Sequence, residues 1–303
     1  MSKILIIDSH KGSKNIEPVN LHFINSRILA NYLKADLIWS YPEVNENIKT
    51  GYDVIIFVHA SKYSYVDYEW VTKNPNAKLF YVTNEYNLGE SYILWMAAKE
   101  GRKYSVIANH PNEASKVVMK YVENWNIVNL NVLSFLPKEE PTEVNNWLEF
   151  ERSGCVYYGS YRKDRQKYYN KYLTKEITLS TYYKNIVKFG TIQSQIIPRI
   201  NWTKRGLFNF KQSLYIEDES THVYYNFLAN RFYEALNYGC VPIFSIECQN
   251  TTKLSGYEIS EEYFITESKQ LLDKTDLKIP REWCDKASKE KEDVLKTIGE
   301  IVL

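Results

Sequence analysis

Short apolar runs alternate with amphipathic segments along the first half of the chain, and this alternation constrains the fold more than any other sequence feature. Four runs are typical of strands buried on both faces of a sheet: KILIID (3–8), DVIIFVHA (53–60), AKLFYVTNE (77–85) and KYSVIAN (103–109). Three segments predict helices: 20–35, 90–101 and 111–125. Another strand is expected over 126–137. Repeated βα units predict a mostly parallel sheet with helices on both faces.

A polar stretch with two prolines, PKEEPTEVNNWLEFERSG (137–154), interrupts this pattern and predicts a linker. The alternation then restarts with four predicted strands: 155–160, 176–180, 213–218 and 240–245. Helices are predicted over 161–173, 226–239 and 281–302. The expected fold class is therefore α/β, with a first domain at 1–150 and a second at 151–303. The last helix of the second domain could pack back on the first domain. Two such domains would face a cleft at the carboxyl ends of their strands.

Composition excludes several classes of protein. A net charge of +1 is far too low for a nucleic-acid packaging protein, so a polyanion could be contacted only through local patches. None of the four cysteines forms a CxxC pair, and we expect them to be buried thiols. We see neither an apolar run long enough to span a membrane nor a signal peptide. We therefore expect a cytoplasmic monomer without membrane contact, and we assign no metal ligands.

The segment YYGSYRKDR (157–165) has the features of an anion site. Gly159 and Ser160 end a predicted strand, and a glycine there lets a ligand approach the backbone, beside the free N–H groups of the next helix. Arg162 and Arg165 are three residues apart and should share a face of its first turn. Arginines are unfavourable beside a helix N-terminus. A bound diphosphate would compensate their charge, although two solvated surface arginines remain the alternative.

A second arginine, Arg231, precedes Glu234 by three residues in LANRFYEALNYGCVPIFS (228–245). A guanidinium fits phosphate oxygens, and a carboxylate can accept hydrogen bonds from a ribose diol. Side by side they would form a nucleoside-diphosphate clamp; the alternative is an ordinary intrahelical ion pair. Ile197, in the loop-like stretch 190–202, would offer an apolar slot and backbone groups to a uracil ring, unless this stretch is simply a core loop.

These residues resemble the donor site of GT-B glycosyltransferases, in which two Rossmann-like domains with mostly parallel sheets face a central cleft. NRFYEALNYGCVPIF is similar to the donor-binding helix and following strand of that class. The upstream arginines and the Arg–x–x–Glu spacing resemble the phage DNA (5-hydroxymethylcytosine) glucosyltransferases. The resemblance implies that Arg162, Arg165 and Arg231 bind the phosphates of a UDP-sugar and that Glu234 binds its ribose. Pro242 stands eight residues after Glu234, where many retaining GT-B enzymes have a second glutamate, so the stereochemistry is not assigned.

The first domain should supply the acceptor side of such an enzyme. Glu85, at the end of a predicted strand, resembles in position the acidic residue that faces the acceptor hydroxyl in the phage enzymes, and could act as general base. Asp8, His10 and His59 are the alternatives, although a lone histidine at a strand end is more often structural. Gly12 could let the backbone approach the donor.

For DNA as acceptor, basic and aromatic residues should line the mouth of the cleft. The candidates are Lys11, Lys14, Lys62, Tyr63, Trp202, Lys204 and Arg205. The resemblance implies a phage-encoded enzyme of the host cytoplasm that moves a sugar from a UDP-sugar to a hydroxyl of a 5-hydroxymethylpyrimidine in DNA. A bacterial surface glycan or lipid-linked acceptor is the alternative, and a non-catalytic nucleotide-binding module is the third option. The sugar and the need for a divalent metal stay open.

Overall fold

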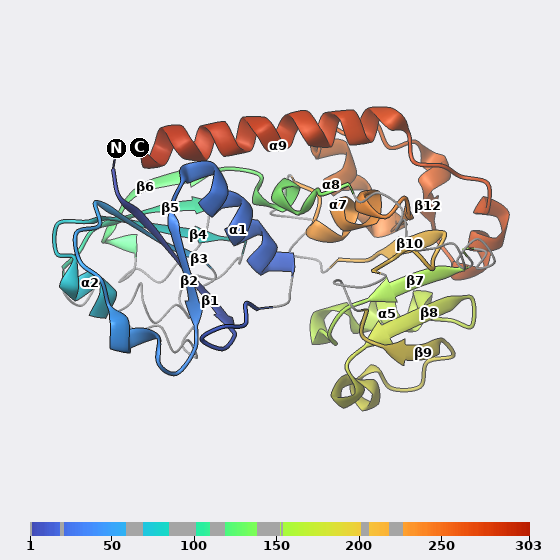
Figure 1. Cartoon of the computed structure of the whole chain (residues 1–303). Coiled ribbons are helices and arrows are strands. Elements are labelled where there is room, and N and C mark those ends of the chain that lie inside the picture. The colour runs from blue at the N-terminus through green and yellow to red at the C-terminus, as the bar shows by residue number, and fades with distance from the viewer. Residues whose placement is uncertain are drawn as a thin grey trace, which may run out of the picture. The chain divides into compact units, whose positions relative to one another are not determined.

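The structure of the chain is a computed structural model (Figure 1), and it contains two compact units. The residues that it describes are 2–18, 21–58, 69–84, 101–109, 119–137, 152, 154–200, 206–217 and 227–303. The first unit comprises Met1–Ser134 together with Glu290–Leu303, and the second comprises Phe135–Lys289. The division of the chain by role, into acceptor and donor domains, stays a prediction.

The first unit is built on a six-stranded parallel sheet in the order β2-β1-β3-β4-β5-β6. Its strands are β1 (Ile4–Lys11), β2 (Asp36–Ser40), β3 (Val54–Val58), β4 (Lys78–Thr83), β5 (Tyr104–Ala108) and β6 (Val122–Ile127). All residues of β3 and β5 are buried, as their continuous apolar runs predict. The strand order reverses direction between β1 and β3, which places a topological switch point there.

Helices of the first unit follow from local sequence. They are α1 (Leu21–Leu33) and α2 (Glu69–Lys73), with 3₁₀ turns at Val44–Asn47 and Leu130–Ser134. Trp70 and Val71 of α2 are buried in one core cluster with Leu5, Ile55 and Val106 of the sheet. Part of α9 (Arg281–Val302) also belongs to this unit, where Asn129 donates a hydrogen bond to Glu290 at 2.7 Å.

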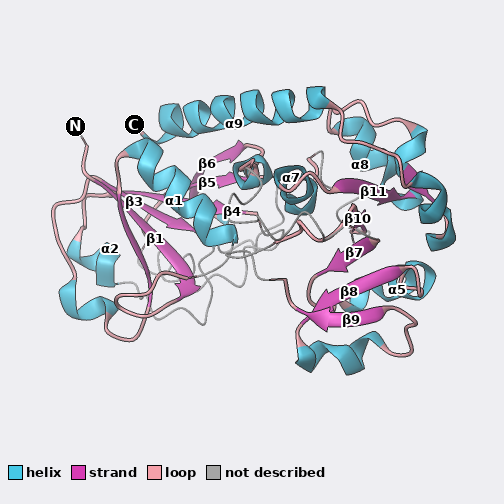
Figure 2. Cartoon of the chain, turned by 45° about the vertical axis from the view of Figure 1, so that its right-hand side comes forward, coloured by secondary structure: helices cyan, strands magenta, loops and turns pink. Residues whose placement is uncertain are grey.

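The second unit also has a six-stranded parallel sheet, in the order β12-β11-β10-β7-β8-β9 (Figure 2). Its strands are β7 (Cys155–Tyr158), β8 (Ile177–Thr181), β9 (Gln195–Pro198), β10 (Gln212–Tyr215), β11 (Val241–Ser245) and β12 (Phe264–Ile265). Numbered within the unit this order is 6-5-4-1-2-3, the strand order of a dinucleotide-binding Rossmann sheet. The switch point lies between β7 and β10, which pair through Cys155 and Gln212.

Helix α7 (Asn230–Asn237) is the element that carries the Arg–x–x–Glu motif. Residues Phe232 to Asn237 are buried, so packing holds this helix from within the motif to its last residue. Gly239, at φ 60°, ends it: Cys240 N–H bonds to Ala235 O at 3.0 Å and Gly239 N–H to Leu236 O at 3.1 Å. This is a Schellman ending, in which a left-handed residue satisfies the last carbonyls.

The other helices in the described part of the second unit are α5 (Gln166–Tyr172) and α8 (Gln249–Leu254), with 3₁₀ turns at Lys163–Arg165, Tyr183–Phe189, Ile246–Cys248, Glu261–Tyr263 and Ser268–Lys274. Cys155, Cys240 and Cys248 are buried as expected, but Cys284 is only partly buried. Among the described residues, no helix is both long enough and apolar enough to cross a membrane.

The main differences from the sequence-based assignment lie at sheet edges. Strands β2, β9 and β12 were not predicted, and the end of the predicted helix 111–125 is strand β6. The predicted strand 126–137 ends at Ile127 and is followed by a 3₁₀ turn. Edge strands face solvent along part of their length, so their apolar pattern is weak. The predicted linker and the helix expected over 90–101 lie almost entirely outside the described residues.

Candidate functional site

Three chain segments converge at the switch point of the second sheet. Gly159 directly follows β7, Glu217 follows β10 by two residues, and Arg231 lies in the first turn of α7. Because β7 and β10 are neighbouring parallel strands, their carboxyl ends meet at the same edge. Ligands of open α/β sheets bind at this edge and at this position in the strand order.

A single buried carboxylate joins the two arginines that converge there. Glu217 Oε2 lies 2.5 Å from Arg165 Nη2, and Glu217 Oε1 lies 2.5 Å from Arg231 Nε. The side chain of Arg165 is 10% exposed, that of Glu217 is 6% exposed and that of Arg231 is 11% exposed. We call these three residues the Glu217 cluster. Two cations surround one anion, so the cluster retains a positive charge that a ligand anion can neutralise.

Glu234 bonds to Tyr158, the last residue of β7. Its Oε2 accepts a hydrogen bond from the Tyr158 hydroxyl at 2.7 Å, and the same hydroxyl lies 3.3 Å from Arg231 O. Arg231 Nη1 donates in turn to Tyr158 O at 3.2 Å. The structure does not show the alternative interpretation, an ordinary intrahelical ion pair, because Arg231 bonds to Glu217 and Tyr158 O and Glu234 bonds to the Tyr158 hydroxyl. Both residues nevertheless lie beside Tyr158, at the end of β7.

Burial and charge shift the pKa values of these groups. Burial alone would lower the pKa of Arg231, but the Glu217 carboxylate and two nearby tyrosines outweigh it and raise that pKa. Burial raises the pKa of Glu234 above its usual value, against the opposing hydrogen bond from Tyr158 and the charge of Arg231. Burial, followed by the charge of Glu234, raises the pKa of Tyr158, so its hydroxyl stays a donor. Arg231 is thus a permanent cation in a desolvated site.

Gly159, directly after β7, leaves space beside its backbone. Its φ is +149°, a value that side-chain-bearing residues rarely adopt, and a Cβ built there would meet no atom of the described residues within 4 Å. Gly159 N–H bonds to Ser180 O at 3.1 Å, and Gly159 O accepts from Thr181 Oγ1 at 2.7 Å. The loop is therefore fixed while one side of the glycine remains unfilled, as close approach of a ligand requires.

Arg162 and Arg165 do not share a helical face as predicted. Arg162 has extended backbone angles, with φ −126° and ψ 125°, and its side chain is exposed. Arg165 is buried at the end of the following 3₁₀ turn. The reason is that the α-helix begins only at Gln166, one turn later than expected. Ser160 is exposed beside them, and Ile197 is a partly buried residue of β9.

In the first unit, two of the predicted alternative bases form a pair. Asp8 is fully buried in β1; its Oδ1 lies 2.6 Å from His10 Nδ1 and accepts a hydrogen bond from His10 N at 2.7 Å. Its Oδ2 accepts a hydrogen bond from the Ser26 hydroxyl. Asp8 is thus enclosed and hydrogen-bonded, whereas the His10 side chain is 27% exposed. These contacts with Asp8 fix the orientation of the His10 ring.

The loop after β1 holds the other predicted residues of the described first unit. Lys11 and Lys14 are exposed. At Gly12, an added Cβ would lie 2.6 Å from Trp39 Cδ1 and 2.7 Å from Ile16 O, so local packing by itself explains a glycine here. The approach of a donor to Gly12 stays a prediction.

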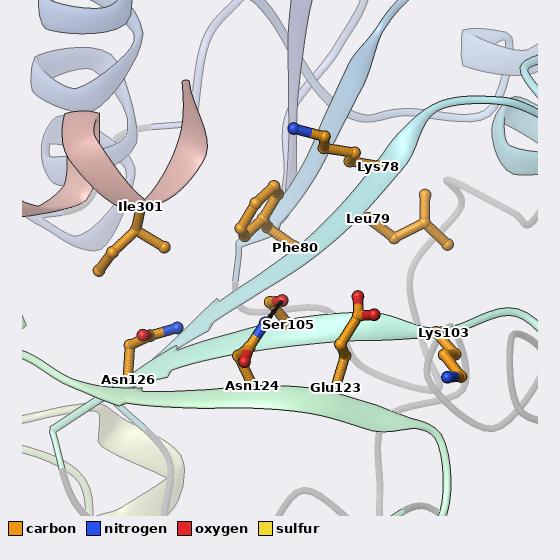
Figure 3. A pocket seen from close by; sticks show the side chains of 9 residues that line it. All are labelled: Lys78, Leu79, Phe80, Lys103, Ser105, Glu123, Asn124, Asn126 and Ile301. Atoms are coloured by element: carbon orange, nitrogen blue, oxygen red, sulfur yellow. Dashed lines mark hydrogen bonds between the residues drawn. The ribbon is translucent and has the colours of Figure 1, made fainter.

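A hollow of about 350 Å³ lies elsewhere in the first unit, between the starts of β4 and β5, strand β6 and the end of α9 (Figure 3). Lys78, Lys103 and Glu123 are among its lining residues, with Asn124 bonded to Ser105 at 3.4 Å. Lys78 begins β4 and Lys103 precedes β5, so this hollow is at the opposite edge of the sheet from the carboxyl ends.

Several predicted residues lie outside the described part of the chain: Glu85, His59, Lys62, Tyr63, Trp202, Lys204 and Arg205. Two residues of the site were not predicted, Glu217 and Tyr158. The signal for Glu217 was its place in SLYIED, as the first acidic residue after a strand. Within the described ranges, no group of three or more His, Cys, Asp or Glu side chains could hold a metal ion.

Comparison with known proteins identifies the fold. The chain matches no protein-family model and no curated protein sequence. It matches a structure of the DNA modifying enzyme beta-glucosyltransferase with and without uridine diphosphoglucose, over 98% of this chain and 95% of that one, with a TM-score of 0.60 and 14% identity. Two structures of the T4 phage enzyme, one on substrate binding and one with UDP and Mn²⁺, match over the same shares at 14% identity, with TM-scores of 0.62 and 0.59. The predicted GT-B class, an α/β fold with two parallel sheets, is thus confirmed.

Proposed function

We propose that this chain, which has the fold of T4 phage β-glucosyltransferase, is a glycosyltransferase that moves a sugar from a UDP-sugar to a hydroxyl of a 5-hydroxymethylpyrimidine in DNA. The observation that supports it most is the Glu217 cluster, which gathers two buried arginines at the switch point of the second sheet. UDP and UDP-glucose, the ligands of the structurally similar enzymes, carry the diphosphate that such a cluster would bind.

The cluster provides donors for a diphosphate. An arginine has five N–H donors, and Arg231 uses Nε for Glu217 and Nη1 for Tyr158 O. A guanidinium that is already held in place loses little further entropy when it binds a phosphate oxygen. Burial also strengthens the attraction, because the surroundings screen charge less than water does. Exposed Arg162 would add a third cation after the open Gly159 backbone.

Glu234 would bind the ribose. Tyr158 donates to its Oε2, and a carboxyl group has lone pairs for further hydrogen bonds. The hydroxyls of a ribose are neutral donors, which suit a carboxyl group that is buried beside a positively charged arginine. Ile197, at the end of β9, would lie against the uracil ring, as the resemblance implies.

The acceptor hydroxyl must lose its proton as it attacks the anomeric carbon of the sugar. We keep Glu85 as the proposed general base and His10 as its rival. Asp8 is a poor base because it is buried and already accepts hydrogen bonds from Ser26 and His10. It would instead hold the His10 ring so that Nε2 points away from Asp8 and can accept a proton.

Incubation with radiolabelled UDP-glucose and other UDP-sugars tests the proposal. The acceptors are hydroxymethylcytosine DNA, hydroxymethyluracil DNA and unmodified DNA, each with and without Mn²⁺. We expect label in a hydroxymethylated polymer and none in unmodified DNA. Binding of UDP without transfer to any of these polymers would contradict the DNA acceptor and leave the donor assignment in place. Absence of UDP binding would contradict both.

A further inference from the structure

A long acid-free stretch separates Glu176 from Glu217. The 40 residues 177–216 contain six Lys or Arg and no Asp or Glu, whereas the rest of the chain contains 32 Lys or Arg and 37 Asp or Glu. A protein of net charge +1 therefore concentrates positive charge in one segment. Segregation of this kind marks a local contact with a polyanion, which the total charge of the chain conceals.

The structure places exposed aromatic and apolar side chains within this same segment. Between β8 and β9, the 3₁₀ turn Tyr183–Phe189 exposes Tyr183 by 81% and Val187 by 89%. Lys184 and Lys188 are exposed on the same turn. Phe189 is buried and packs with its ring centroid 4.9 Å from that of Tyr169, so the turn is anchored to α5.

Tyr182 links this turn to the end of β9. The Arg199 guanidinium lies 4.3 Å from the centroid of the Tyr182 ring, and Lys184 Nζ lies 5.7 Å from it. Such contacts hold cations over an aromatic face while they remain accessible to solvent. We call Tyr182, Tyr183, Lys184, Val187, Lys188 and Arg199 the basic aromatic surface.

This surface begins at the edge of the sheet that carries the donor site. Thr181, which ends β8, donates to Gly159 O at 2.7 Å and pairs with Pro198, which ends β9. Arg199 also lies close enough for its charge to lower the pKa of Glu234. A polymer bound along the surface would therefore pass close to the donor.

We propose that the basic aromatic surface binds the sugar–phosphate backbone of DNA beside the acceptor nucleotide. This inference rests on the proposed function. Lysines neutralise phosphates, and exposed tyrosines can stack on bases or pack against sugars without selecting a sequence. Trp202, Lys204 and Arg205, which the sequence predicts as DNA contacts, belong to the same acid-free stretch but lie outside the described residues. The basic aromatic surface fits a protein partner less well than DNA, because the core positions of protein interfaces are depleted of lysine.

The test measures binding of a hydroxymethylcytosine duplex across a range of salt concentrations for three proteins. They are the wild type, Lys184→Ala/Lys188→Ala, and the matched control Lys253→Ala/Lys289→Ala, which removes two exposed lysines of the second unit outside the stretch. We expect the first variant to bind DNA at least about tenfold more weakly, with a salt slope lower by about 2, since each phosphate contact contributes about 0.9. Tyr183→Ala should weaken binding by about fivefold or more. The control should match the wild type, and UDP affinity should be unchanged in all variants.

Each other result overturns the inference. If Lys184→Ala/Lys188→Ala has the same DNA affinity and salt slope as the wild type, the basic aromatic surface does not bind DNA. The proposed function would be unaffected by that result. Equal losses in the control variant would show a nonspecific effect of charge. Loss of UDP affinity in Lys184→Ala/Lys188→Ala would mean that the two lysines contribute to donor binding or to folding, not to DNA binding. If the wild type binds UDP but no DNA, both the surface and the DNA acceptor fail.

Discussion

Glu217 and Arg231 form a buried ion pair, with Oε1 2.5 Å from Nε, although 14 residues separate them in the chain. The other oxygen of Glu217 pairs with Arg165 from a third segment. One carboxylate thus fixes two guanidiniums at the switch point of the second sheet. If the carboxylate is removed, the two guanidiniums lose the ion-pair partner that they share.

Glu217→Gln should lower the free energy of unfolding by about 3–5 kcal/mol, the usual cost of removing one partner of a buried ion pair. Chemical denaturation measures this difference. Glu258→Gln, an exposed position of the same unit, is the control and should stay within about 0.5 kcal/mol of wild type. Equal stability of Glu217→Gln and wild type would mean that the two arginines do not depend on this carboxylate.

Gly159→Ala should weaken UDP binding, whereas Gly154→Ala should not. Both glycines flank β7, both have positive φ, at +149° and +66°, and neither has an atom within 4 Å of an added Cβ. Each substitution should therefore cost stability by about 1–3 kcal/mol through backbone strain. Only Gly159 is at the carboxyl end of the strand, where the new methyl group would meet the donor. Calorimetry with UDP measures both variants, and equal affinities would contradict close approach at Gly159.

Glu234→Gln should change how stability depends on pH. Burial raises the folded-state pKa of Glu234 above its ordinary value of 4.5, so the folded protein holds this proton more tightly than the unfolded chain does. The contribution of Glu234 to stability is then highest below pH 4.5 and falls as the pH rises through the folded pKa. Glutamine cannot ionise, so the stability of Glu234→Gln relative to wild type should increase from pH 4.5 upward. Denaturation at several pH values measures this, and a relative stability that falls with pH would contradict it.

The two proposed bases can be distinguished on matched preparations. Glu85→Gln and His10→Gln each remove basicity at one site, and loss of a general base lowers turnover by about 10²–10⁴-fold. Only the variant of the true base should show that loss. UDP affinity should stay close to wild type, because the proposed donor site lies in the second unit. Asp8→Asn should lower turnover only if His10 is the base, since Asp8 orients that ring. Near wild-type turnover in both glutamine variants would exclude both bases.

Much of the fold follows directly from local sequence. Strands β3 and β5 are covered on both faces, so every residue in them is buried. A run of consecutive apolar residues in the sequence is therefore enough to predict them. The closing helix was predicted at the bounds it has, Arg281–Val302, because helical spacing persists across it. The sequence likewise indicated that Gly159, Arg165, Arg231 and Glu234 belong to one site, since each follows or precedes a predicted strand end.

Only the tertiary structure decided which of these groups bond to each other. Helical spacing suggests that Arg231 meets Glu234, but Arg231 pairs with Glu217 after β10, and Glu234 bonds to Tyr158 at the end of β7. These partners come together because β7 and β10 are neighbours at the point where strand order reverses. Residue periodicity records how each segment is buried, whereas strand order depends on the packing of the whole sheet. Local sequence therefore determines the helices and strands. The pairing of Arg231 with Glu217, and of Glu234 with Tyr158, is decided only when the six strands of the sheet assemble.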